Sequence, residues 1–162
     1  MGKKTFFAFC LLAATACGAE EVFLEFEEAA LPEGITAEKS TVSLDTRRRI
    51  RGDQSLKWDW KPGATLRIDR VVECRPELNR REEGFRKTRT FKFWIHNEVP
   101  MPGKQLKGVF GDAVGEPCSF PFNLDFIGWR SAWVSYERDM EGVPDRDLSF
   151  IRFEAPQDGS GT

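Results

Sequence analysis

The chain has 162 residues, which is enough for one domain with a hydrophobic core and short for two. Hydrophobic residues make up 40% and charged residues 31% of it, the balance of an ordinary globular protein. A single His and a single Tyr leave few groups besides carboxylates for acid–base catalysis, which argues against a self-sufficient enzyme.

The first 19 residues have the pattern of a secretory signal peptide. A basic start, MGKK, precedes the apolar run TFFAFCLLAATA, and small residues at 16–19 offer cleavage sites. We therefore expect an exported protein, periplasmic or secreted, with a signal peptide at residues 1–19. A lipoprotein attached through Cys17 is less favoured, because Ala14 stands where such a signal has a larger aliphatic residue. No later segment is long and apolar enough to cross a bilayer.

Removal of this leader takes away Lys3 and Lys4 and leaves 22 basic residues against 26 acidic ones. The net charge therefore gives no reason to expect nucleic acid as a partner. The basic residues are nevertheless clustered: residues 46–51 (TRRRIR) hold four arginines, and residues 67–92 hold nine Lys or Arg against five acids. Such runs are most often solvated surface, but their segregation indicates where an anion site would lie.

Apolar and polar residues alternate with a period of two through most of the remaining chain, which predicts short β-strands. Gly and Pro separate them, as at Pro62 and Gly63. This pattern predicts an all-β sandwich over residues 20–156, followed by a linker-like tail at 157–162. The polar stretch 75–87 is expected to be a loop or a helical turn. The expected strands are 21–26, 55–60, 64–72, 89–98, 105–112, 119–126, 132–138 and 148–156.

Four tryptophans are expected to anchor the core, because each shares a strand face with Leu56 or Ile127. They are Trp58, Trp60, Trp129 and Trp133. Two cysteines lie in the body of the chain, Cys74 and Cys118, and their spacing fits no metal motif. They form either a disulfide, which an exported protein permits, or two buried free thiols.

Four segments in register resemble the N-terminal domain of chondroitin sulfate ABC-type lyases. They are GDQSLKWDWKPGATL, FKFWIHNEVP, FNLDFIGWRSAWVSYERDMEGVP and LSFIRFEAP, and the resemblance covers Val22 to Pro156. It implies a jelly-roll sandwich of two antiparallel sheets, like carbohydrate-binding modules of the galactose-binding type. It also implies that the lyase chemistry belongs to a helical toroid that follows this domain in the family. No catalytic residue can therefore be assigned, and we expect no enzymatic activity from this chain alone, whether it is a fragment or a free-standing module.

The resemblance implies sulfated glycosaminoglycan chains, such as chondroitin or dermatan sulfate, as partners, together with the lyase catalytic domain. Guanidinium and ammonium groups suit sulfate and carboxylate, and aromatic faces stack on sugar rings. A purely structural role, in which the sandwich packs on the catalytic domain and orients it, is the main alternative. The candidate sugar-binding residues are Arg49 in the run Arg47–Arg49, Lys57, Arg89, Lys92, Trp94, His96, Arg130 and Arg138.

Catalytic alternatives depend on few side chains. His96 and Tyr136 are the sole His–Tyr pair, and Asp139/Glu141 or Asp145/Asp147 could act as glycosidase carboxylates. A structural or surface role is the favoured interpretation of each. No cofactor is expected to be required, although a structural calcium ion, as in related jelly-roll modules, could take oxygen ligands from Glu25 or Glu27, Asp53 and Asp147.

Overall fold

The computed structural model describes residues 8–14, 23–24, 26–72, 74, 90–144 and 146–162. Its elements are nine β-strands, and the described residues form no helix, which confirms the predicted all-β class. The strands are β1 (Ala8–Ala14), β2 (Phe23–Leu24), β3 (Ile35–Asp45), β4 (Ser55–Val72), β5 (Thr90–Asn97), β6 (Gln105–Gly111), β7 (Cys118–Asn123), β8 (Gly128–Ser135) and β9 (Leu148–Glu154).

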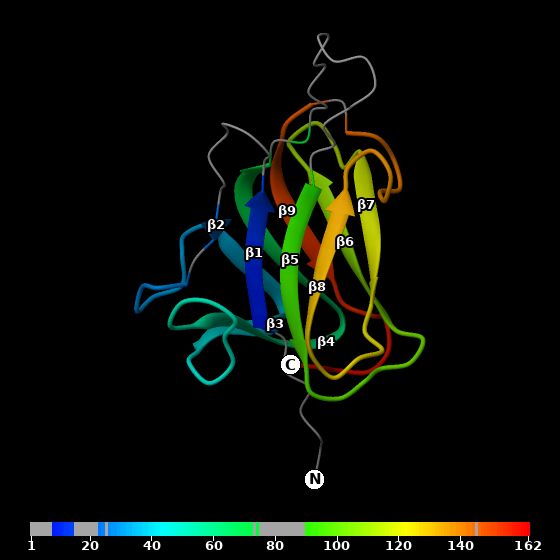
Figure 1. Cartoon of the computed structure of the whole chain (residues 1–162). Helices are drawn as coiled ribbons and strands as arrows, with labels where there is room; N and C mark the ends of the chain where they lie inside the picture. Colours follow the sequence, from blue (N-terminus) through cyan, green and yellow to red (C-terminus); the bar gives the residue numbers. More distant parts are fainter. Residues whose placement is uncertain (1–7, 15–22, 25, 73, 75–89, 145) are drawn as a thin grey trace.

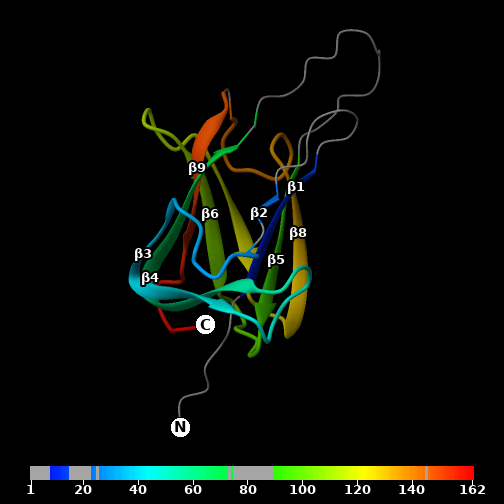
Figure 2. The ribbon, with the colours of Figure 1, turned by 90° about the vertical axis from the view of Figure 1, so that its left-hand side faces the viewer.

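The strands are hydrogen-bonded in the order β7-β6-β9-β4-β1-β5-β8, and all these pairings are antiparallel. This path folds over on itself and forms the two layers of a sandwich. Figure 2 shows β6 and β9 in one layer and β5 and β8 in the other. β1 lies in the second layer beside β5, which separates it from β8 (Figure 1). The sandwich is thus confirmed, while its jelly-roll character stays a prediction.

β4 is long enough to belong to both layers. Its second half pairs with β9 between Thr65 and Val72, and its first half pairs with β1 at Leu56 and Lys57. The strand bends where we predicted a turn: Gly63 has a φ of 63°, and the pairing with β3 skips from Thr65 to Trp60. β3 accompanies both halves. No strand was predicted there, because several alternate positions are polar, and none of its apolar residues is fully buried.

The core lies between the layers and is rich in phenylalanine. On β5, Phe91, Phe93 and Ile95 are at most 1% exposed, as their alternation predicts. The Phe91 ring meets Phe110 of the other layer edge-on, with ring centroids 5.0 Å apart. Phe93 contacts Phe120 across the layers with the ring planes tilted by 50° and the ring centroids 5.5 Å apart. Trp58 and Trp60 are buried in this core, as predicted.

The other two tryptophans are not core anchors, and this prediction is wrong. Trp133 is 63% exposed and Trp129 is half-buried, while Ala132 and Val134 occupy the inward positions of β8. The error arises from Ile127, which served as the reference for the buried face. Ile127 is itself 71% exposed, so Trp129 and Trp133, which share its phase in the alternation, lie on the outward side of β8.

Residues near both ends of the sequence, predicted as a leader and a tail, take part in strand pairing. Residues 8–14, within the predicted signal peptide, form β1 in the centre of the hydrogen-bonded path. The tail returns to the sheet, where Gly161 pairs with Trp60 and Thr162 is buried. The predicted strand at 21–26 is represented by β2 and the buried Phe26. The predicted loop at 75–87 lies outside the described residues.

Candidate functional site

The outward side of β5 and β8 collects the aromatic and basic side chains that the core does not use. Register pairs Lys92 with Trp133, Trp94 with Ser131 and His96 with Trp129. Directly paired residues point to the same side of a sheet, so their side chains are neighbours. We call this set the β5–β8 face: Lys92, Trp94, His96, Trp129, Ser131 and Trp133.

Trp133 and Lys92 form the most exposed part of this face. The Lys92 ammonium nitrogen lies 3.9 Å from the centroid of the Trp133 ring, which is a cation–π contact. Trp133 is 63% exposed, so its indole is open to a ligand beside the ammonium group. The pair therefore presents an aromatic surface and a positive charge together, which is what a ring-shaped anionic ligand requires.

His96 and Trp129 form the other end of the face. Their rings meet edge-on with centroids 5.2 Å apart, and Nδ1 of His96 is buried without a hydrogen-bond partner among the described residues. Burial and the nearby Arg48 charge lower the pKa of His96, and Asp45 opposes them only in part. His96 is therefore neutral at pH 7, so it can offer a hydrogen bond to a ligand but no charge.

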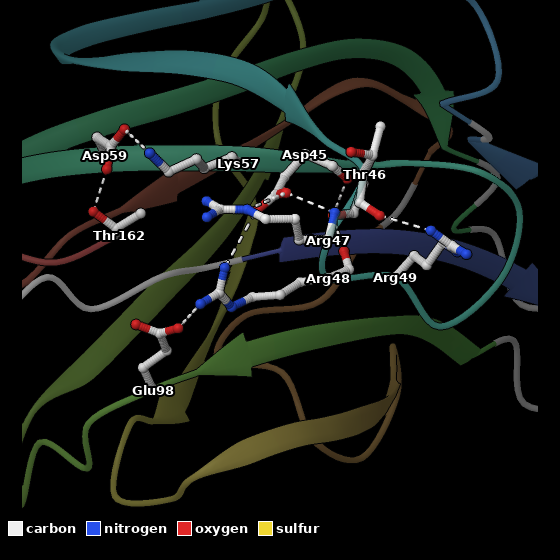
Figure 3. A network of polar contacts seen from close by, with 10 residues as sticks. Asp45, Thr46, Arg47, Arg48, Arg49, Lys57, Asp59, Glu98 and Thr162 are labelled. Atoms are coloured by element: carbon white, nitrogen blue, oxygen red, sulfur yellow. Dashed lines mark hydrogen bonds and ion pairs between the residues drawn. The ribbon is translucent and has the colours of Figure 1, made fainter.

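The arginine run next to this face is held in place by carboxylates (Figure 3). The buried Asp45 carboxylate accepts a hydrogen bond from the Arg47 backbone N–H at 2.8 Å. It also forms an ion pair with the Arg48 guanidinium at 3.4 Å. Burial raises the pKa of Asp45, but these partners outweigh it and lower the pKa overall. Arg48 also makes an ion pair with Glu98, just after β5. Arg49 donates to the backbone carbonyl of Thr46 at 2.6 Å and stays exposed.

The remaining predicted sugar-binding residues lie elsewhere. Lys57 is paired with Asp59 at 2.7 Å on β4. The Arg130 guanidinium lies 4.6 Å from the Phe126 ring centroid, near the start of β8. Arg138 holds Asp139 through two hydrogen bonds of 2.7 and 2.8 Å beyond the opposite end of β8. Arg89 lies outside the described residues.

The face therefore unites three of the predicted residues, Lys92, Trp94 and His96, with two that the sequence reasoning placed in the core, Trp129 and Trp133. Knowing that β5 pairs with β8 would have identified both tryptophans, because they lie opposite the outward residues Lys92 and His96. The two strands are far apart in the chain, so the sequence contains no direct signal for their pairing.

The structure does not bring the His96–Tyr136 pair together. His96 lies opposite Trp129 at one end of β5, whereas Tyr136 follows Ser135, the partner of Thr90 at the other end. Six residues of extended chain separate these positions by about 20 Å. Asp139 is bound by Arg138 and the Ser135 N–H, and these partners lower its pKa to about 2. Asp145 lies outside the described residues.

The structure describes three of the proposed calcium ligands, Glu27, Asp53 and Asp147. The Glu27 carboxylate accepts from the Asp53 backbone N–H at 3.2 Å, so these two segments meet. In the part of the chain that the structure describes, no group of three or more His, Cys, Asp or Glu is arranged to hold a metal ion. Asp147 lies at the start of β9, and Glu25 is outside the described residues. The calcium site therefore stays a prediction.

Cys74 and Cys118 are buried free thiols in the structure, the second of the two predicted alternatives. Burial raises the pKa of Cys74 to about 12, and the neighbouring Cys118 adds to this shift. Burial likewise raises the pKa of Cys118 to about 11. Both groups are therefore protonated and poor nucleophiles at neutral pH.

Comparison with known proteins places these features in a family. A family model described as "Lyase, N terminal" matches residues 20–162. A chondroitin sulfate ABC exolyase of Bacteroides thetaiotaomicron is 33% identical over 138 residues, which are 85% of this chain and 13% of that protein. A chondroitin sulfate ABC endolyase of Proteus vulgaris is 32% identical over 127 residues, 75% of this chain and 12% of that protein.

A chondroitin sulfate ABC exolyase of Proteus vulgaris is also 32% identical, over 80% of this chain and 12% of its own length. The chain thus spans 12–13% of the length of these relatives. The described residues contain no helix that is long and apolar enough to span a membrane.

Proposed function

The chain belongs to the family of lyase N-terminal domains, and on this premise we propose that it is an exported, non-catalytic module that binds sulfated glycosaminoglycan for a polysaccharide lyase. The observation that carries the proposal is the exposed Trp133 with Lys92 against its ring. The relatives bear the name chondroitin sulfate ABC lyase, which supports a sulfated uronate polymer as the ligand.

The chemistry of the β5–β8 face suits such a polymer. Each sugar ring offers an apolar side that can stack on an indole, and its sulfate or carboxylate attracts an ammonium group. Lys92 supplies the charge beside Trp133, and the indole of Trp94 is paired opposite Ser131 on the same side. The neutral His96 supplies a polar group without adding desolvation cost for a second charge.

Three observations support a non-catalytic role. His96 and Tyr136 lie at opposite ends of β5, Asp139 is held ionised by Arg138, and Glu141 pairs with Ser119 across an isolated bridge. β-Elimination needs a base, an acid and a group that neutralises the uronate within reach of one another. With His96 and Tyr136 at opposite ends of β5, this pair does not supply both the acid and the base at one position, which supports chemistry carried by another part of the parent protein.

Affinity electrophoresis in gels containing chondroitin sulfate tests the proposal. The exported chain should be retarded at low salt, and the retardation should disappear as salt rises because the contacts are ionic. A gel with neutral dextran serves as the control and should cause no retardation. Equal mobility in both gels at low salt would exclude the sugar-binding role, and appearance of an absorbing unsaturated uronate product would overturn the non-catalytic one.

A structural role on the lyase catalytic domain is the second candidate, favoured by a different surface. Val71, Val114 and Val143 are each at least 71% exposed; Val71 lies in the last part of β4, and Val114 and Val143 lie in the segments that follow β6 and β8. The paired termini of β4 and β9, and the bridge of Ser119 with Glu141, bring these ends to the same side of the sandwich. Substituting all three valines with Ser should leave chondroitin sulfate retardation intact but weaken binding to an added catalytic domain.

A further inference from the structure

β1 occupies a central place in the sheet although its residues belong to the predicted signal peptide. Six of its residues pair with β5, and Ala8 and Phe9 pair with Lys57 and Leu56 of β4. Cleavage near residue 19 would remove this strand and leave two facing backbone edges without partners. An open edge in the middle of a sandwich is unfavourable, since its N–H and C=O groups then lack hydrogen bonds.

The returning tail is directed towards the same place. Gly161 forms an antiparallel bridge with Trp60 through two backbone hydrogen bonds, of 2.8 and 3.2 Å. The next residue, Thr162, donates its hydroxyl to the Asp59 carboxylate, as Figure 3 shows. Each further residue in this register moves one position back along β4, so the second residue after Thr162 would lie opposite Lys57.

Ala8 lies opposite Lys57 in the structure, and β1 runs antiparallel to β4, just as the 161–162 segment does. β1 is therefore collinear with an extension of the chain from Thr162. β2 does not share this property, because it runs antiparallel to β1 through the pairs of Leu24 and Phe23 with Leu11 and Leu12. The mature N-terminal segment would have to reverse its direction to take the same place.

We propose that the place of β1 is a strand-acceptor site, which in the processed protein receives a β-strand continuing from Thr162. The inference rests on the leader cleavage included in the proposed function. Register also defines the chemistry of the incoming strand. Its third, fifth and seventh residues would take the places of Phe9, Leu11 and Ala13, opposite the buried Ile95, Phe93 and Phe91 of β5. These residues must be apolar, and the intervening ones join the outward side that carries Lys92 and Trp94.

Hydrogen exchange tests the site with two versions of the processed chain. One carries eight residues of alternating Val and Thr after Thr162, starting with Val, and the control carries eight residues of Gly and Ser. The Val–Thr strand should slow exchange of the amides in residues 90–95 by at least about tenfold relative to the control, to the protection seen in the unprocessed chain. Equal protection in the two versions would overturn the proposal, because either another segment fills the place or none can.

A second pair of proteins keeps the test decisive if the control version does not fold. The unprocessed chain with Leu11→Pro loses a backbone N–H within the β1–β5 pairing, and it can carry the same two extensions. The Val–Thr extension must then give the higher melting temperature, and equal melting temperatures would contradict the site.

Chondroitin sulfate retardation, measured on the same proteins, separates the two proposals. Retardation without strand protection overturns the acceptor site alone, and protection without retardation overturns sugar binding alone. The mass of the exported protein reports on the shared premise, since an intact leader would overturn the acceptor role of this place.

Discussion

The arginine loop at residues 45–49 and the β5–β8 face show how little the density of charge in a sequence reveals about the charge offered to a ligand. The loop has three consecutive arginines, yet Asp45 engages Arg47 and Arg48, and Glu98 engages Arg48 as well. The face has a single lysine, and Lys92 has no carboxylate partner among the described residues but lies against an exposed indole. The availability of a charge depends on its neighbours rather than on its frequency.

The contrast between the arginine loop and the β5–β8 face predicts its largest effect at Asp45. Asp45→Ala should lower the free energy of unfolding by about 2–3 kcal/mol, because the Arg47 N–H and the Arg48 guanidinium lose their buried acceptor. Urea unfolding followed by fluorescence measures the change. The control is Asp69→Ala, whose ion pair with Arg67 is exposed and should be worth less than about 1 kcal/mol. Similar losses in the two variants would show that the loop is not held by its buried carboxylate.

On the face, the same logic predicts a loss of binding without a loss of stability. Trp133→Ala should weaken chondroitin sulfate binding about tenfold, or 1.4 kcal/mol, because an exposed stacking surface is removed. Its unfolding free energy should change by less than about 0.5 kcal/mol. Ile127→Ala is the matched control, since Ile127 is similarly exposed but lies before β8. An unchanged affinity in Trp133→Ala would remove the face from the binding site.

A third comparison sets lysine against arginine. Lys92→Ala should weaken chondroitin sulfate binding by about threefold to fivefold and reduce its salt dependence, because an ionic contact is lost. Arg48→Ala should leave this affinity nearly unchanged, since its guanidinium already serves Asp45 and Glu98. Lys107→Ala, on an exposed position of β6, controls for net charge. A larger effect from Arg48 than from Lys92 would reverse our interpretation of the two regions.

The smallest expected effect arises where the two regions meet, at His96. Burial and the Arg48 charge lower the pKa of His96 in the folded protein below its ordinary value of 6.5. The neutral imidazole is thus favoured by folding, so its contribution to stability is complete above pH 6.5 and is lost as the pH falls through the lowered pKa. Because the sequence has one His, its NMR signal reports this titration directly. Arg48→Ala should raise the pKa, and no change would show that burial alone sets it.

Strand positions were largely predictable, because one-sided burial imposes a period of two that survives in the sequence. Phe91, Phe93 and Ile95 show this, as do Trp58 and Trp60. The pattern failed at Trp133, because the residue taken as the reference for the buried face, Ile127, is itself exposed. β3 was missed because half-buried positions tolerate Ser and Ala. Local alternation thus separates the two faces of a strand, but an apolar residue beside the strand does not identify the buried one.

The site was less predictable, since it depends on pairing between segments far apart in the chain. Lys92 and Trp94 were identified from their outward phase, but nothing local indicates that Trp133 lies opposite Lys92. The return of Gly161 to Trp60 is equally non-local, and a Gly- and Ser-rich tail is typical of a linker. The arginine run was misleading for the converse reason: its acceptors include Glu98, about 50 residues away in the chain, and a sequence pattern does not show such neutralisation.

The continuous β3–β4 pair has a consequence for how the molecule yields under load. Because β4 is hydrogen-bonded to β3 on both sides of the bend at Gly63, two continuous strands connect the two layers. Tension applied at Thr162 would enter this pair through Trp60 and be shared between the two layers. In the proposed glycosaminoglycan-binding role, the domain would thereby resist pulling as one cooperative unit, without separation of its two layers.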